Sequence, residues 1–321
     1  MALKHDLSRR SLLAGALALG LTACGTNTGG QQESGAQTKK VATDLGEVEV
    51  PLNPQRVVSA DFYPAFILQD LGITPVGVCE YTEELVPPMY RNLLQVTKIG
   101  PNGQPNVQQI ATLAPDLVVS MGYVSGLARM QPVYDQLKVV TSTVVLLSDS
   151  QAKFWKEGAD RLAPIVGKEA EGNRLRDEYN GKAAGIKQKH AEKLGRTKWA
   201  YVSQGNNTGT WTLNFAGSAF GGVLADAGVQ FGQAAAGQTK NGQQYSYEQL
   251  NVLADCDVIL YPVTYAGQPR QPVQDVLNQS TFRDLPAVKA GKVLPMPNYS
   301  VASYRLGIDA LGDVEAVLEG L

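Results

Sequence analysis

Aromatic and cationic side chains are the best candidates for chemistry in this 321-residue chain, because several of them fall where expected strands end. The tyrosines of this group lie at or just after strand ends, the arginines lie in loops or early helix turns, and one tryptophan follows the polar segment 205–210. The group consists of Tyr63, Tyr81, Arg91, Tyr123, Trp211, Tyr265, Arg270, Tyr299 and Arg305. Aromatic faces and a few guanidinium groups suit a large, partly apolar ligand with anionic or polar oxygens. We predict that these residues bind such a ligand, although any single tyrosine at a strand end can equally well be structural.

Residues that bind metals or act as nucleophiles are scarce. The chain has only two histidines, His5 and His190, and three cysteines, Cys24, Cys79 and Cys256. These counts exclude a histidine-and-cysteine metal cage and a disulfide framework, so we predict no protein-held metal and no cofactor. His190 lies in a lysine-rich segment and is expected on a solvated helix face, far from the ligand. Cys79 and Cys256 belong to different lobes of the expected fold and should be free, buried thiols.

Enzymatic sequence motifs are also missing. The segment 217–221 is not G-x-S-x-G, and no phosphate-binding G-x-x-x-x-G-K-[ST] is present. Asp61, Glu80, Glu83 and Glu84 are candidates for paired carboxylates by position only. A net charge of −2 gives no basic field for nucleic acid. We therefore predict a binding protein rather than an enzyme, with no nucleic-acid partner.

The N-terminus has the features of an export signal. Basic residues precede an apolar run at 11–21, which is shorter than the roughly 20 residues that cross a bilayer. Arg9-Arg10 resembles a twin-arginine (Tat) export motif, and Leu21-Thr22-Ala23-Cys24 resembles the lipobox of bacterial lipoproteins. We predict a signal peptide at 1–23, acylation of Cys24 with a palmitate-type chain, and a flexible tether at 24–40. The protein would then be exported and anchored by lipid to the outer face of the cell membrane.

The remaining sequence alternates short β-branched runs with helical patterns, which predicts the fold class α/β. Two lobes with mostly parallel central sheets are expected, joined by one long rigid helix. The N-terminal lobe would span 41–166, the connecting helix 167–195 and the C-terminal lobe 196–321. Ligands of parallel sheets bind beyond the carboxyl ends of the strands, so the predicted ligand residues should face the space between the lobes.

Several segments carry a family resemblance over nearly all of residues 41–321. Segments 53–58, 71–78, 110–119, 247–250 and 285–293 resemble the helical-backbone substrate-binding proteins of iron–siderophore, haem and cobalamin ABC importers. Segments 120–123 and 215–228 resemble the ferric-hydroxamate branch more specifically. The resemblance implies a monomer that captures a ferric siderophore and delivers it to an ABC permease with a separate ATPase. A haem or cobalamin ligand, or a surface interaction role without transport, stays open as an alternative.

The same resemblance implies two permease-docking positions, one on each lobe. Glu248 matches the carboxylate of the C-terminal lobe, but Gln108 stands where the N-terminal lobe should carry an acid. A neutral amide cannot form the charge-assisted pair that a carboxylate forms with a permease arginine. Docking would then be asymmetric, or Glu83 or Glu84 would substitute, or the transport role would be lost.

Overall fold

A five-stranded parallel sheet forms the centre of the first half of the chain. In the computed structural model, which describes residues 37–321, its strand order is β5-β4-β3-β6-β7. The strands are β3 (Val57–Ser59), β4 (Gly77–Val78), β5 (Thr97–Lys98), β6 (Leu117–Tyr123) and β7 (Thr143–Ser148). The first five residues of β6 are all buried, as expected for a parallel sheet that is covered on both faces.

Helices cover both faces of this first sheet. Leu117 and Val119 pack with α1 (Phe62–Asp70) and α4 (Gln151–Ile165), whereas Val118 between them packs with α2 (Val107–Thr112) and α3 (Leu127–Val140). The alternation follows from the two-residue period of a strand. Short 3₁₀ helices η1 (Glu83–Leu85), η2 (Pro88–Gln95) and η3 (Val124–Gly126) complete this half.

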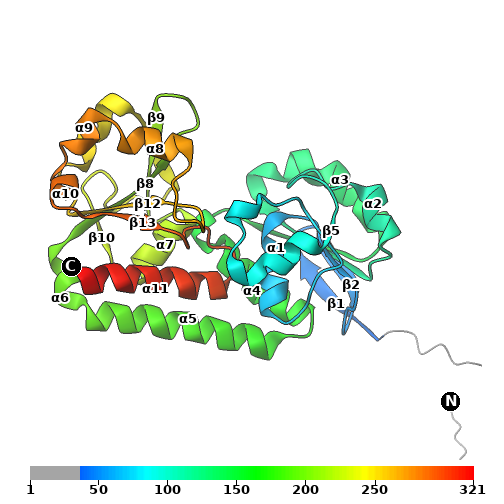
Figure 1. The fold of residues 1–321 in the computed structure, drawn as a ribbon. Helices are drawn as coiled ribbons and strands as arrows, with labels where there is room; N and C mark the ends of the chain where they lie inside the picture. The colour runs from blue at the N-terminus through cyan, green and yellow to red at the C-terminus, as the bar shows by residue number, and fades with distance from the viewer. Residues whose placement is uncertain (1–36) are drawn as a thin grey trace, which may run out of the picture. The chain divides into compact units, whose positions relative to one another are not determined.

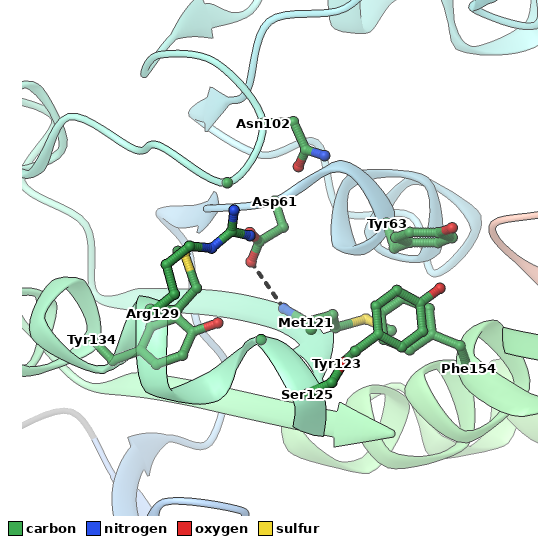
Figure 2. A pocket seen from close by; sticks show the side chains of 13 residues that line it. Asp61, Tyr63, Asn102, Met121, Tyr123, Ser125, Arg129, Tyr134 and Phe154 are labelled. Atoms are coloured by element: carbon green, nitrogen blue, oxygen red, sulfur yellow. Dashed lines mark hydrogen bonds between the residues drawn. The ribbon is translucent and has the colours of Figure 1, made fainter. Parts of the chain in front are cut away.

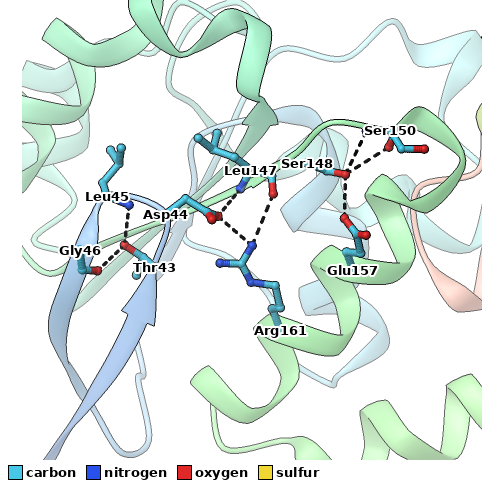
Figure 3. Close-up of polar contacts among 9 residues, drawn as sticks. All are labelled: Thr43, Asp44, Leu45, Gly46, Leu147, Ser148, Ser150, Glu157 and Arg161. Carbon is cyan, nitrogen blue, oxygen red and sulfur yellow. Dashed lines mark hydrogen bonds and ion pairs between the residues drawn. The ribbon is translucent and has the colours of Figure 1, made fainter. Parts of the chain in front are cut away.

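An N-terminal hairpin packs beside the first sheet. Strands β1 (Thr38–Thr43) and β2 (Gly46–Pro51) pair antiparallel, so the predicted tether at 24–40 extends too far and residues 38–40 belong to β1. At the turn, Asp44 Oδ2 accepts hydrogen bonds from Leu147 N and from an Arg161 guanidinium nitrogen, each at 2.7 Å (Figure 3). One carboxylate therefore ties the hairpin to both β7 and α4.

A second sheet of six strands organises the C-terminal half. Its order is β11-β9-β8-β12-β13, with β10 paired to β8. The strands are β8 (Lys198–Gln204), β9 (Thr210–Asn214), β10 (Gln230–Phe231), β11 (Gly242–Ser246), β12 (Val258–Pro262) and β13 (Val293–Met296). β8, β10, β12 and β13 pair in parallel, and β9 pairs antiparallel with both β8 and β11, so this sheet is mostly parallel, as predicted, with the one difference that β9 is reversed. The polar segment 205–209 causes the difference, because it is the tight turn that reverses the chain between β8 and β9.

Long helices lie beside the second sheet. Helix α5 (Glu169–Lys189) ends near His190, where the backbone has φ −109° and ψ 19°, and the short α6 (Ala191–Arg196) follows. The connecting helix predicted at 167–195 is thus two helices with a break between them. Leu175, Tyr179, Ala183 and Ile186 form the buried face of α5, which packs against α4 and α11 (Tyr304–Gly320) (Figure 1). The prediction that His190 is solvated is wrong, since it is 7% exposed and continues this buried face.

The remaining helices of this half are short. They are α7 (Ala219–Asp226), the 3₁₀ helix η4 (Tyr247–Leu253), α8 (Gln271–Leu277), α9 (Ser280–Arg283) and α10 (Pro286–Lys289). Within residues 37–321, no helix has both the length and the apolar composition needed to cross a membrane. Cys79 and Cys256 are free and buried, which confirms the prediction for them. The predicted signal peptide, the twin-arginine motif and Cys24 lie outside the described residues.

Candidate functional site

A pocket opens where the strand order of the first sheet changes direction. After β3 the chain forms β4 on one side, and β6 is later added on the other side, so a crevice lies between the carboxyl ends of β3 and β6. The N-terminal pocket, as we call it, has a volume of about 430 Å³, and its lining includes residues at or shortly after the ends of these two strands, among them Asp61, Tyr63, Tyr123 and Ser125. Its position follows from the topology alone.

Aromatic rings form one wall of the N-terminal pocket. The rings of Tyr123 and Phe154 stack with centroids 4.5 Å apart and an interplanar angle of 30°. Tyr63 meets the same Phe154 ring edge-on, also at 4.5 Å. Figure 2 shows these three rings together, with the polar side chains of Asp61, Arg129 and Tyr134 on the other side of the pocket. The pocket therefore offers an aromatic surface opposite hydrogen-bonding groups.

Asp61 is the buried acid of this pocket. Its carboxylate accepts hydrogen bonds from the Ser120 hydroxyl and, at 3.0 Å, from the Met121 backbone N–H. Burial raises the pKa of Asp61 to about 6, although both hydrogen bonds favour the charged form. Asp61 also precedes α1, whose first backbone N–H, that of Phe62, donates instead to Asn102 Oδ1 at 3.0 Å. The carboxylate is thus free to face the pocket, and it changes charge near neutral pH.

A second pocket lies at the carboxyl ends of β8 and β12. This C-terminal pocket has a volume of about 220 Å³ and is lined by Tyr201, Ser203, Gln204, Pro262, Val263, Arg270, Val273 and Tyr299. Tyr299 is half-buried, and burial raises the pKa of its hydroxyl while the Arg270 charge opposes that rise. Hydroxyl, amide and guanidinium groups converge here with fewer aromatic surfaces than in the N-terminal pocket.

A third hollow, the bridging pocket, joins segments from the two halves of the chain. Thr82, Glu83, Glu84 and Arg91 come from the first half and Tyr265 and Ala266 from the second, around a volume of about 470 Å³. The Tyr265 backbone N–H donates to the Glu84 carbonyl at 3.4 Å, and Arg270 Nε lies 3.9 Å from Glu84 Oε1. Glu84 therefore connects the loop after β12 to the segment that follows β4.

Six of the nine predicted ligand residues line these pockets. Tyr63 and Tyr123 lie in the N-terminal pocket, Arg91 and Tyr265 in the bridging pocket, and Arg270 and Tyr299 in the C-terminal pocket. The Tyr265 hydroxyl is buried and has no hydrogen-bond partner among residues 37–321, so a bound molecule could supply one.

The other three predicted residues lie elsewhere. The prediction for Trp211 is wrong: it is 0% exposed, its Nε1 donates to the Ser246 carbonyl at 3.0 Å, and its ring stacks on Tyr245. Tyr81 is half-buried against the rings of Phe62 and Phe66 and lines none of the three pockets. Arg305 also lines none of them, because its charge faces Asp70 and Asp309.

Some pocket residues are absent from the predicted set. Arg129, the cation of the N-terminal pocket, comes from α3, and Phe154 comes from the first turns of α4. Asp61 lies two residues after the end of β3, so the rule that ligands bind at carboxyl ends of strands would have found it. Ser203 and Gln204 end β8 and could have been found in the same way.

The two expected docking positions are exposed. Glu248 lies in the first turn of η4 and is exposed, and a hydrogen bond with Ser246 holds the pKa of its carboxyl below the usual range. Gln108 lies in α2. Glu248 is thus a charged surface group, whereas Gln108 is neutral.

Comparison with known proteins agrees with this architecture. Residues 57–299 match the model of the periplasmic binding protein family, and this range includes the residues that line all three pockets. The chain belongs to the periplasmic binding protein family. Its members are substrate-binding components of transport rather than enzymes, in agreement with the absence of catalytic motifs.

Three sequence relatives are substrate-binding or iron-binding proteins of Bacillus subtilis. A putative ABC transporter substrate-binding lipoprotein of Bacillus subtilis is 32% identical over 173 residues, which are 53% of this chain and 52% of that protein. The chain thus spans about half the length of this relative and of a probable siderophore-binding lipoprotein of the same organism. An Fe(3+)-citrate-binding protein of Bacillus subtilis is 24% identical over 88% of this chain and 85% of that protein.

A solved structure extends the similarity to the whole fold. The siderophore periplasmic binding protein from the fuscachelin gene cluster of Thermobifida fusca has a TM-score of 0.76 and 25% identity, covering 84% of this chain and 98% of that one. The predicted α/β fold with two lobes is therefore confirmed.

Proposed function

We propose that this protein captures a ferric siderophore and delivers it to an ABC permease that works with a separate ATPase. One observation carries the proposal: an aromatic wall and a guanidinium group lie at the carboxyl ends of the first sheet, and further guanidinium groups line the C-terminal and bridging pockets. Rings pack on the apolar backbone of a chelator, and guanidinium groups donate to the oxygens that surround its iron. The names of the relatives and of the fuscachelin-cluster protein support the same cargo.

The balance of charges in the pockets favours a weakly charged chelate. The pockets carry three cationic and three acidic groups, namely Arg91, Arg129, Arg270, Asp61, Glu83 and Glu84. A strongly anionic ferric catecholate would need a surplus of cations, since an uncompensated buried charge is costly. A ferric hydroxamate has little net charge and suits a balanced site, in line with the resemblance in segments 120–123 and 215–228.

Titration calorimetry with matched ferric chelates tests this proposal. Ferric hydroxamates should bind with 1:1 stoichiometry and more tightly than ferric catecholates, haem or cobalamin. Arg129→Gln should weaken the binding, whereas Arg196→Gln, which removes an exposed arginine of α6, should leave it unchanged. Failure of every ferric chelate to bind, or saturable binding of haem or cobalamin alone, would contradict the proposal.

The protein would reach its place of work through its N-terminus. We propose export by a signal peptide over residues 1–23, with the twin-arginine route, followed by acylation of Cys24 with a palmitate-type chain. The relatives named as lipoproteins support an anchored form at the outer face of the membrane. Cys24→Ala should release the protein from membranes, and an unchanged membrane fraction would contradict the anchor.

Docking to the permease would rely mainly on Glu248. A monomeric binding protein with one charged docking group and one neutral amide would dock asymmetrically. Glu248→Gln should reduce permease-dependent iron uptake without changing chelate affinity, and Gln108→Glu should increase uptake. Unchanged uptake in both variants would contradict docking at these two positions.

A further inference from the structure

His190 has an unsatisfied buried nitrogen far from the three pockets. It lies between α5 and α6 and is 7% exposed, and its Nε2 has no hydrogen-bond partner among residues 37–321. Buried polar atoms are almost always paired, so an exception needs an explanation. When the proton of the neutral imidazole is on Nδ1, Nε2 presents a lone pair that can bind a cation.

Two carboxylates of α11 face the same point. Glu315 and Glu319 are one helical turn apart, and Glu315 Oε1 lies 3.7 Å from His190 Nε2. One ligand atom from each of the three residues lies within 4.8 Å of the others. An imidazole lone pair directed at a carboxylate is repulsive, and a cation placed between them would remove that repulsion.

Lys189 provides the positive charge in the absence of a metal. Its Nζ lies 2.8 Å from Glu315 Oε1 and 2.8 Å from Glu319 Oε1. The Lys189 side chain is 55% exposed, so the ammonium can move into solvent without leaving a buried charge behind. A divalent ion in its place would balance both carboxylates and also use the unpaired imidazole nitrogen.

We propose that His190, Glu315 and Glu319 bind a zinc-type divalent cation and that the Lys189 ammonium is displaced when the metal enters. One nitrogen and two carboxylate oxygens are ligands that Zn²⁺ accepts, at about 2.0–2.2 Å, with water in a fourth position. Because the ligand atoms are somewhat farther apart than this requires, the exposed Glu319 side chain closes around the ion. The bound metal would join the α5–α6 break to the C-terminal half of α11.

Calorimetric titration of the full chain with Zn²⁺, without chelators or siderophore, tests the site. Wild type should bind one equivalent of Zn²⁺. Because His190 is one of the proposed ligands, His190→Gln should weaken this binding by at least about tenfold. Glu319→Gln removes an exposed ligand with little risk to folding and should weaken it similarly. Lys189→Met should tighten binding several-fold, because the competing ammonium is gone.

Glu178→Gln is the matched control, since it removes an exposed helix carboxylate that forms an ion pair with Arg174, away from the proposed ligands. It should leave Zn²⁺ affinity unchanged, and a given concentration of Zn²⁺ should raise the melting temperature of wild type more than that of Glu319→Gln. Absence of Zn²⁺ binding in wild type, or equal binding in wild type, His190→Gln and Glu319→Gln, would overturn the proposal. Neither result bears on siderophore capture, which uses other residues.

Discussion

The N-terminal and C-terminal pockets occupy equivalent places in their sheets but are built differently. Both lie beyond the carboxyl ends of adjacent parallel strands, β3 and β6 in one case and β8 and β12 in the other. The first is larger, at about 430 Å³ against 220 Å³, and combines three packed rings with a buried acid. In the second, Arg270 is partly neutralised by Glu84. Pockets at equivalent strand ends thus differ in character. The N-terminal pocket is suited to packing against a ligand, whereas the C-terminal pocket offers an arginine whose effective charge depends on its pairing with Glu84.

Truncation of the shared ring in the N-terminal pocket should have the largest effect. Phe154 is 2% exposed and contacts both Tyr63 and Tyr123. Phe154→Ala should lower the free energy of unfolding by about 3–5 kcal/mol, as measured by urea denaturation, and also weaken chelate binding. Phe282→Ala, at an equally buried ring in the second half, should destabilise similarly but leave affinity unchanged. Equal loss of affinity in both variants would show that the aromatic wall has no special role.

The buried acid should make the first pocket sensitive to pH. The folded state holds the Asp61 proton more tightly than the unfolded chain, because burial raises its pKa from 3.8 to about 6. The contribution of Asp61 to stability is therefore complete below pH 4 and is lost as the pH rises through 6. In urea denaturation, the free energy of unfolding of Asp61→Asn, taken relative to that of wild type, should rise by about 3 kcal/mol between pH 4 and pH 8.

Asp135→Asn, which removes an exposed carboxylate of α3, is the control for this experiment. The stability difference for Asp61→Asn should change with pH by more than the stability difference for Asp135→Asn. If both differences changed equally with pH, the N-terminal pocket would not contain a titrating buried acid.

The two pocket arginines should contribute unequally to binding. Arg129→Gln should weaken affinity for a ferric hydroxamate by about 10–100-fold, because a hydrogen bond to a charged group contributes about 1.5–3 kcal/mol. Arg270→Gln should weaken it less than tenfold, since Glu84 already shares its charge. Calorimetric affinities of the two variants measure the contrast, and a larger loss for Arg270→Gln would reverse our ranking of the pockets.

Release of Arg270 from its partner should have the smallest effect. The pair of Arg270 with Glu84 is exposed, and such pairs contribute about 0–1 kcal/mol. Glu84→Gln should therefore tighten binding of an anionic chelate by no more than about fivefold. Weaker binding in this variant would mean that Glu84 contacts the ligand instead of restraining Arg270.

The fold was largely predictable because long apolar runs specify buried parallel strands. The runs at 117–119 and 258–260 are buried, as the sequence indicates, and helices lie between them. The reversed strand β9 was not predicted, because segment 205–210 has the composition of a ligand loop as well as that of a turn. Trp211 was misplaced for the same reason: once the chain reverses there, strand alternation directs its side chain into the core.

Local patterns were less informative for residues whose surroundings come from distant segments. His190 follows Leu175, Tyr179, Ala183 and Ile186 at helical spacing, so its burial could have been predicted from the period despite the neighbouring lysines. Phe154 and Arg129 lie on helices whose packing decides which side chains reach the pocket. Whether these side chains reach the pocket depends on tertiary structure, which local sequence patterns do not specify.

The most direct test of the account is a crystal structure of the protein saturated with a ferric hydroxamate. We predict that the chelate lies against Tyr123 and Phe154 in the N-terminal pocket, with its oxygens near Arg129, and that it reaches Arg270 across the bridging pocket. A chelate bound away from the carboxyl ends of β3 and β6, without contact to the aromatic wall, would contradict the central claim.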